Sequence, residues 1–530
     1  MDGQFGRWRD HDKRACLPSH RRLLANTIAD LVSILFSCPS TPTTATSPMP
    51  KSHAPDELEL PLARSALRAN LTDIDRCSRG VSMLPTLHTK TIAVLVFSFS
   101  CYACYVYARL FASRSTPALE PLTSRHLHAL QRHDWAQYSP YFPVAAYQAP
   151  PESCSISQLQ RHGARYPTSG AGAQIEAALA KLQAVKNYTD PRLSFLRTFS
   201  YDLGTNDLVA FGATQSFEAG QEAFARYGHL VSDDNLPFVR ASSSERVVLS
   251  ATNWTAGFAA ASKDRFAPVL SVILPESGND TLDDNMCPAA GSSDPQTNAW
   301  LAVFAPPITA QLNAGAPGAN LSDTDTFSLI SMCPFETVAH ENRSQFCGLF
   351  EGMDAFPAFE YSGDLNKYYG TGYGQPLGPV QGVGYVNELL ARLTDTPVRD
   401  HTQTNSTLDS SPATFPLDRT LYADFSHDNQ MAAIYAAMGL FPERAPLDPT
   451  TPDPSRTWVA ARLVSFSARM VVEKLECAEG THVRIFVNDE LQPLAFCGAA
   501  ADGLCSLEAF VESQAYARSD GGGDWEKCFL

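Results

Sequence analysis

A histidine between two arginines is the most reactive group of residues in the sequence. Arg161, His162 and Arg165 lie within the stretch Gln160-Arg-His-Gly-Ala-Arg-Tyr-Pro-Thr168. Guanidinium groups are planar forks that bind tetrahedral oxyanions through paired hydrogen bonds. The stretch therefore indicates a phosphate site, although arginine and histidine are also common in solvated basic turns.

The residues on either side of this stretch predict a strand, a loop and then a helix. Ile156 and Leu159 are the apolar residues of a short strand. A helical spacing follows, with apolar residues at Ile175, Ala178, Leu179, Leu182 and Val185. A loop that leads into a helix presents free backbone N–H groups and the positive end of the helix dipole, and both favour an anion.

A second strand, loop and helix lies far along the chain. Residues 420–425 alternate like a strand, Ser426-His427-Asp428-Asn429 follow, and a helical stripe runs through Met431, Ile434, Tyr435 and Met438. Ionisable residues at such a bend are expected at the carboxyl edge of a sheet, where α/β folds bind their ligands. We expect this bend to face the first loop.

A third candidate phosphate contact follows the predicted strand 236–239. Arg240 opens the segment Arg240-Ala-Ser-Ser-Ser-Glu-Arg246, and we interpret it as an arginine at the end of a strand. Further elements are predicted as a helix over 386–393 and strands over 468–475 and 483–487.

Together these residues suit phosphoryl transfer through a covalent phosphohistidine. His162 is the predicted nucleophile, and neighbouring cations would keep its imidazole unprotonated in acid. Arg161, Arg165 and Arg240 would hold the phosphate, and His427 would donate to a phosphate oxygen. Asp428 would protonate the leaving oxygen and then deprotonate water. No metal and no cofactor are expected, because arginines supply the positive charge.

Bulk composition narrows the class of protein. The 530 residues carry a formal net charge of −16, which argues against nucleic acid as a partner. The sequence contains no P-loop and no G-x-S-x-G motif. His340-Glu341 begins a zinc-protease pattern, but Ser344 stands where the second histidine is needed.

Cysteines and glycosylation sequons indicate an oxidising compartment. Eight of the 13 cysteines lie at or beyond Cys154, an even number that allows four disulfides without fixing their pairing. The same region carries six N-x-S/T sequons, at Asn187, Asn253, Asn279, Asn320, Asn342 and Asn405. Cysteines and sequons together favour the secretory pathway.

The first 120 residues are expected to be a disordered extension, and residues 121–530 the catalytic domain. Residues 91–107 are almost wholly apolar and close to the length of about 20 that a membrane helix needs. With a start at Met83 they would be a cleaved signal peptide, and the protein would be secreted. With a start at Met1 they would be an uncleaved anchor in the secretory pathway.

The chain resembles the histidine acid phosphatase family, and within it the fungal phytases, especially those of basidiomycetes. The resemblance is carried by Arg161-His-Gly-Ala-Arg165-Tyr-Pro167, by Ser426-His-Asp428, and by 236–246 as the third-arginine segment. Further motifs are Lys367-Tyr-Tyr-Gly-Thr-Gly-Tyr-Gly374, residues 378–388, 279–291 and 421–429, and the ending Gly-Gly-Asp524-Trp-Glu-Lys-Cys528. The match runs from about residue 138 to the C-terminus.

The resemblance implies a fold, a substrate and a disulfide pattern. The fold would be α/β, a mixed sheet flanked by helices, with a smaller inserted helical domain drawn mainly from the middle of the chain. The substrate would be phytate, attacked first at the 6-phosphate, with Lys367 as a candidate distal contact. The implied disulfides are Cys154–Cys477, Cys287–Cys528, Cys333–Cys347 and Cys497–Cys505.

Two departures from the family pattern affect these expectations. The segment between Cys154 and Arg161 is about three residues shorter than usual, and residues 169–174 lack lysines that could hold distal phosphates. Three alternatives stay open. They are a broad-specificity acid phosphatase, an inositol-polyphosphate phosphatase retained on a membrane, and a non-catalytic phosphate-binding protein.

Overall fold

The computed structural model describes residues 134–150, 155–499 and 502–530, which belong to one compact unit. The predicted extension 1–120, with its apolar segment 91–107, and Cys154 lie outside the described residues. Across the described ranges, no helix is both long enough and apolar enough to cross a membrane.

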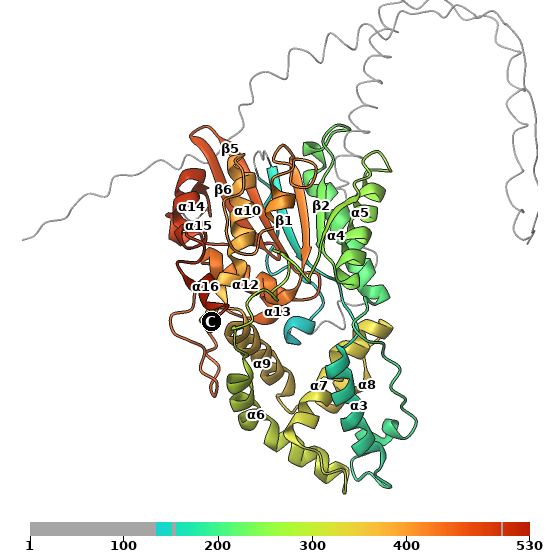
Figure 1. Cartoon of the computed structure of the whole chain (residues 1–530). Helices are drawn as coiled ribbons and strands as arrows, with labels where there is room; N and C mark the ends of the chain where they lie inside the picture. Colours follow the sequence, from blue (N-terminus) through green and yellow to red (C-terminus); the bar gives the residue numbers. More distant parts are fainter. Residues whose placement is uncertain (1–133, 151–154, 500–501) are drawn as a thin grey trace, which may run out of the picture. The chain divides into compact units, whose positions relative to one another are not determined.

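A mixed eight-stranded sheet forms the centre of the fold (Figure 1). Its path runs β3-β2-β4-β1-β5-β6-β7, and β8 pairs with β6. The strands β3, β2, β4 and β1 are parallel, whereas β5, β6, β7 and β8 pair in antiparallel fashion. The bounds are β1 Ser155–Arg161, β2 Phe238–Ser242, β3 Leu270–Leu274, β4 Leu421–Ser426, β5 Arg469–Cys477, β6 Gly480–Val487, β7 Glu490–Leu491 and β8 Cys505–Ser506.

Helices cover both faces of this sheet. One face packs against α4 (Ala210–Tyr227) and α5 (Glu245–Ala261), and its core includes Ile156, Ala241 and Phe425. The other face packs against α10 (Val383–Thr394) and α12 (Asp428–Met438). A Cβ on Gly220 of α4 would lie 2.0 Å from the carbonyl oxygen of Trp254 in α5, so this glycine permits the close helix contact.

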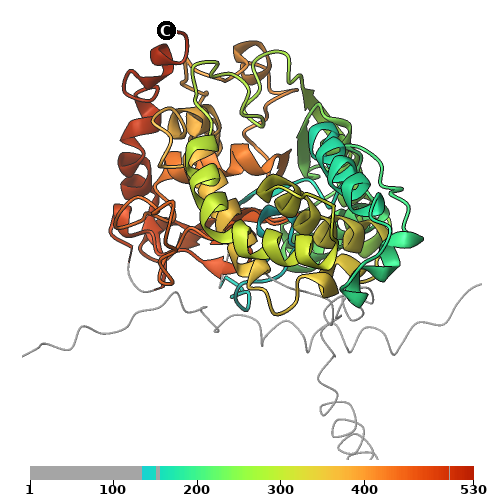
Figure 2. The same ribbon diagram turned by 90° about the horizontal axis from the view of Figure 1, so that it is seen from below.

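A second group of helices lies beyond one end of the sheet (Figure 1) and faces the viewer in Figure 2. It consists of α3 Ser169–Gln183, α6 Asp294–Gly315, α7 Asp323–His340, α8 Gln345–Leu349 and α9 Ala355–Gly370. Twelve of the 18 residues of α7 are buried, so this helix is the centre of the group. The fold class predicted from the resemblance, a mixed sheet with a helical part from the middle of the chain, is confirmed.

Short elements connect these layers. The 3-10 helices are η1 Ala136–Tyr138, η2 Pro191–Arg197, η3 Gly228–Leu230, η4 Pro379–Gly382 and η5 Ala495–Cys497. The remaining helices are α11 Ser406–Asp409, α13 Ala460–Val464, α14 Leu507–Ser513, α15 Ala515–Arg518 and α16 Asp524–Lys527.

One disulfide joins segments that are distant in sequence, and two close local loops. Cys287–Cys528, Cys333–Cys347 and Cys497–Cys505 are formed in the structure, as the resemblance implies. The pairing of Cys154 with Cys477 cannot be followed, because Cys154 is outside the described residues. The strand after Cys154 is nevertheless fully paired, with β4 on one side and β5 on the other.

Candidate active site

Parallel pairing of β1 with β4 brings the two predicted loops together. Arg161 is in register with Ser426, and the backbone N–H of His162 donates to the carbonyl of Ser426 over 3.0 Å. The two strands therefore end at one edge of the sheet, with His162 directly after β1 and His427 directly after β4. The sequence-based expectation that these bends face one another is confirmed.

The loop after β1 is fixed by the helices of one sheet face. The N–H of Gly163 donates to Ser250 of α5 at 3.0 Å, and the N–H of Ala164 donates to Gln215 of α4 at 3.0 Å. A Cβ on Gly163 would lie 2.1 Å from the carbonyl oxygen of Gly212. Only glycine fits at this position, which explains the glycine that follows the histidine.

The imidazole of His162 is held as a neutral ring with a free nitrogen. Its Nδ1 lies 2.8 Å from the carbonyl oxygen of Gly163, so Nδ1 carries the proton and Nε2 keeps its lone pair. Burial and the nearby guanidiniums of Arg161, Arg165 and Arg246 hold the pKa of His162 well below its usual range. A nucleophile at Nε2 is therefore available in acid.

Three arginines near His162 have N–H groups without a hydrogen-bond partner in the described part of the chain. They are Nε and Nη2 of Arg161, Nε of Arg165 and Nε of Arg246. Other donors of these side chains are engaged, since Nη1 of Arg161 binds the carbonyls of Gln137 and Val464. Buried donors without partners are rare in folded proteins, so this set indicates room for an anion.

Arg240, predicted as the third phosphate contact, is not part of this group. Its Nε donates to Asp424 at 2.8 Å and its Nη2 to Glu388 at 2.6 Å, and its side chain is 1 % exposed. The predicted strand ended too early, because β2 continues to Ser242. Arg240 therefore points to the α10 face beside its cross-strand partner Asp424. Arg246, in the first turn of α5, reaches the site instead.

His427 belongs to a hydrogen-bonded chain. Its Nδ1 lies 3.2 Å from Nη2 of Arg246, and its Nε2 lies 3.0 Å from a carboxylate oxygen of Glu276. Arginine only donates, so Nδ1 accepts and Nε2–H donates to Glu276. This hydrogen bond holds the pKa of Glu276 well below its usual range.

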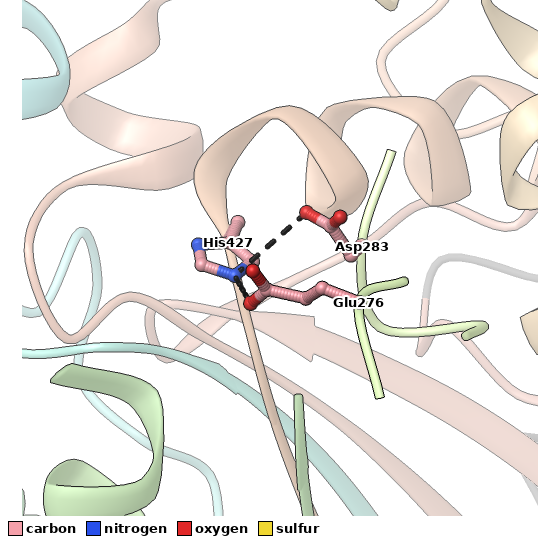
Figure 3. Close-up of side chains that lie close together, drawn as sticks. All are labelled: Glu276, Asp283 and His427. Atoms are coloured by element: carbon pink, nitrogen blue, oxygen red, sulfur yellow. Dashed lines mark hydrogen bonds and ion pairs between the residues drawn. The ribbon is translucent and has the colours of Figure 1, made fainter. Parts of the chain in front are cut away.

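The same group could be interpreted as a metal site. His427, Glu276 and Asp283 offer ligand atoms within 4.8 Å of one another (Figure 3). Metal binding needs the lone pair of a deprotonated ring nitrogen, but Nε2 is the nitrogen that faces both carboxylates and carries the proton. The arrangement therefore favours a hydrogen-bond donor over a metal ligand.

Asp428 lies at the first position of α12, close to two cations. Its Oδ2 is 2.8 Å from Nζ of Lys367 and 3.4 Å from Nη2 of Arg161. Burial alone would raise the pKa of Asp428, but these cations hold it well below its usual range. Lys367, predicted as a distal contact, is only 5 % exposed and also donates to Asn429 at 2.6 Å.

A cavity of about 630 Å³ adjoins these residues. Arg165, Lys367 and Asp428 line it, together with Asp284 from the segment between β3 and α6 and Asp294 at the start of α6. Its volume lies within the range of ligand pockets, about 300–1,000 Å³. Its charged lining residues are of both signs, with the cations Arg165 and Lys367 and the carboxylates of Asp284, Asp294 and Asp428.

Besides Arg246, two acidic contributors to the site are not predicted from the sequence. Glu276 and Asp283 follow β3, and no strand is predicted at that position from the sequence. The apolar run Leu270–Leu274 carried the signal, because acidic residues after a parallel strand fall at the same sheet edge.

The predicted sequon asparagines Asn187, Asn279, Asn320 and Asn342 are exposed, whereas Asn253 and Asn405 are half-buried.

The chain belongs to the histidine phosphatase superfamily, branch 2, whose family model matches residues 155–488. It is 39% identical over 425 residues to Phytase A of Aspergillus oryzae, a match that covers 75% of this chain and 90% of that protein. It is 41% identical over 427 residues to a Phytase A of Aspergillus terreus, with the same coverage of 75% and 90%.

Solved structures share the fold at low identity. The phytase from D. castellii aligns with a TM-score of 0.61 at 20% identity, covering 77% of this chain and 89% of that one. The Bifidobacterium longum multiple inositol polyphosphate phosphatase, in complex with inositol hexasulfate, aligns with a TM-score of 0.54 at 14% identity, covering 71% and 96%.

Proposed function

We propose that this protein is a phosphoric monoester hydrolase that releases phosphate from phytate through a phosphohistidine at His162. The observation that carries the proposal is the set of guanidinium N–H groups of Arg161, Arg165 and Arg246 that make no hydrogen bond within the described residues, beside a neutral buried histidine. The identity to fungal Phytase A proteins supports phytate as the substrate.

In the first step, Nε2 of His162 attacks phosphorus and the bond from phosphorus to the ester oxygen breaks. The three arginines neutralise the charge on the equatorial oxygens, and Nε2–H of His427 turns from Glu276 to donate to one of them. A proton on Asp428 passes to the leaving oxygen, so an inositol hydroxyl departs rather than an alkoxide.

In the second step, water attacks phosphorus and the bond from phosphorus to Nε2 breaks. Asp428, now ionised, accepts the proton of the attacking water. The products are inorganic phosphate and free His162, so the protein returns to its starting state. Neither step requires a metal ion or a cofactor, and a chelator is expected to leave turnover unchanged.

The direct test is release of phosphate from phytate at mildly acidic pH, below the ordinary imidazole pKa of about 6.5. We expect turnover with phytate in the presence of a chelator. Rapid quenching in base should trap a phosphohistidine, because the phosphorus–nitrogen bond survives alkali, and peptide mapping should place it at His162. A protein that binds phytate without any turnover would instead be a phosphate-binding protein.

Comparison of phytate with simple phosphate monoesters distinguishes a phytase from the alternative of a broad-specificity acid phosphatase. A broad-specificity acid phosphatase would hydrolyse simple monoesters readily and phytate poorly. The mixed charge of the cavity, with Asp284 and Asp294 among its lining residues, makes this comparison informative. The proposed first point of attack is the 6-phosphate, and separation of the pentakisphosphate isomers tests it.

The proposed location is extracellular. Three disulfides and exposed sequon asparagines fit passage through the secretory pathway. Sequencing of the mature N-terminus tests this. A mature chain that begins after residue 107 supports secretion, whereas a retained segment 91–107 supports the membrane-anchored alternative.

A further inference from the structure

Lys367 connects the helical group to the reactive edge of the sheet. It lies in the last turn of α9, and its Nζ contacts Oδ2 of Asp428 at 2.8 Å and Oδ1 of Asn429 at 2.6 Å. The hydroxyl of Thr371, just past the end of α9, also donates to the carbonyl of Asn429 at 3.0 Å. The first turn of α12 is thus fastened to the end of α9.

This contact is in conflict with the chemistry required of Asp428. An acid that protonates a leaving oxygen must hold a proton at the moment of transfer. In the structure Lys367 and Arg161 both contact Oδ2 of Asp428, and two such cations favour the ionised carboxylate. The resting site therefore holds Asp428 as a base, and one cation has to withdraw before Asp428 can act as an acid.

The two cations differ in their freedom to move. Arg161 is 0 % exposed, and its Nη1 is fixed by the carbonyls of Gln137 and Val464. Lys367 ends in a compact ammonium on a flexible four-carbon stem, and it lines the cavity that would hold the substrate. Lys367 is thus the cation that an incoming phosphate can draw away.

We propose that Lys367 is a positioning residue that controls the protonation of Asp428 by exchanging Asp428 for a substrate phosphate. This proposal rests on the proposed function. The ammonium moves to a phosphate oxygen, and Asp428 then takes up one proton. A phosphate monoester has a second pKa of about 6, so at mildly acidic pH the substrate itself can supply that proton.

The proton is expected on Oδ1 of Asp428, because Arg161 stays beside Oδ2 after Lys367 has moved. Other titratable groups that act on this carboxyl are the neutral His162 in the loop after β1, Arg246 in α5 and Asp284 in the loop after β3. Each of these remains in place when Lys367 is substituted.

The first experiment compares the pH dependence of kcat for Lys367→Met, Lys367→Arg and the natural protein. Removal of one cation within 4 Å of a carboxylate should raise its pKa by about 1 unit or more. In Lys367→Met the limb of the profile that Asp428 sets is expected to move to higher pH by that amount, whether the acid step or the base step limits turnover. Lys367→Arg keeps the charge and should stay close to the natural profile.

The second experiment needs no turnover. The probe is myo-inositol hexasulfate, whose sulfate groups carry no proton at these pH values. Calorimetric titration in buffers of different ionisation enthalpy measures proton uptake on binding. We expect close to one proton for the natural protein, clearly less for Lys367→Met, and loss of the same uptake in Asp428→Asn.

The outcomes are distinct. A higher KM for Lys367→Met with an unchanged pH profile of kcat would make Lys367 a plain substrate contact and overturn the proposal. Equal proton uptake in the natural protein and Asp428→Asn would also overturn it. Absence of phosphate release by the natural protein would instead refute the proposed function. Circular dichroism and thermal unfolding confirm that each variant is folded.

Discussion

Substitution of Arg246 should lower turnover, whereas substitution of Arg240 should lower stability, although both arginines lie in one seven-residue segment. Arg246→Ala removes a guanidinium that contacts His427 at 3.2 Å and has an unpartnered Nε beside the proposed phosphate. Loss of one group that stabilises charge in a transition state typically lowers turnover by about 10²–10³-fold. Because Arg246 is half-buried, we expect the free energy of unfolding of the Arg246→Ala protein to differ from that of the natural protein by less than about 1 kcal/mol.

Arg240→Met should instead act on stability. The substitution leaves Glu388 and Asp424 buried, 2 % and 0 % exposed, without a cation that contacts both. Breaking a buried ion pair from one side costs about 3–5 kcal/mol. Arg392 still contacts Asp424 at 2.6 Å, which favours the lower end of that range.

The assay measures phosphate release and denaturant unfolding of both variants on the same preparations. Arg246→Lys is the matched control, because it keeps the positive charge but not the fork, and we expect intermediate activity. The reasoning would be refuted by a fully active Arg246→Ala. It would equally be refuted by an Arg240→Met protein of natural stability that has lost turnover, since Arg240 would then contact the substrate.

Three further predictions follow from the described contacts. His162→Ala should lose turnover by a factor on the order of 10⁶ while phosphate binding persists, and residual burst kinetics in that variant would contradict the assignment of the nucleophile. Burial raises the pKa of Asp364 to about 6 and that of Glu360 well above its usual range, so the folded state binds extra protons at this pair. Its contribution to stability is full below the unfolded carboxyl pKa of about 4 and declines as pH rises through 6, and Glu360→Gln should flatten that decline in denaturant unfolding between pH 4 and 7. Cys333→Ser opens a loop of 14 residues and should cost about 3 kcal/mol, measured by unfolding against a reduced control. The freed thiol of Cys347 is buried, so it should be labelled only as the protein unfolds.

The sequence alone predicts the strands with alternating or apolar residues and the bends that follow them. The residues Arg161, His162 and Arg165 and the bend His427-Asp428 were found from residue type and spacing, because a strand that leads into a helix ends at the ligand-binding edge of an α/β sheet. The family resemblance added the mixed sheet, the helical part and three disulfides that the structure contains.

Side-chain direction and partners beyond the local sequence were decided only by the tertiary structure. Arg240 and Arg246 lie in one segment, but β2 continues three residues beyond its predicted end at Val239, so Arg240 faces α10 and Arg246 reaches the site. The family resemblance predicts Lys367 as a distal substrate contact. In the structure, the packing of α9 against α12 places it beside Asp428. A local sequence pattern fixes where a chain bends and which groups it offers. Whether an arginine forms a buried ion pair or part of an open anion site depends on which charged residues from other parts of the chain pack beside it.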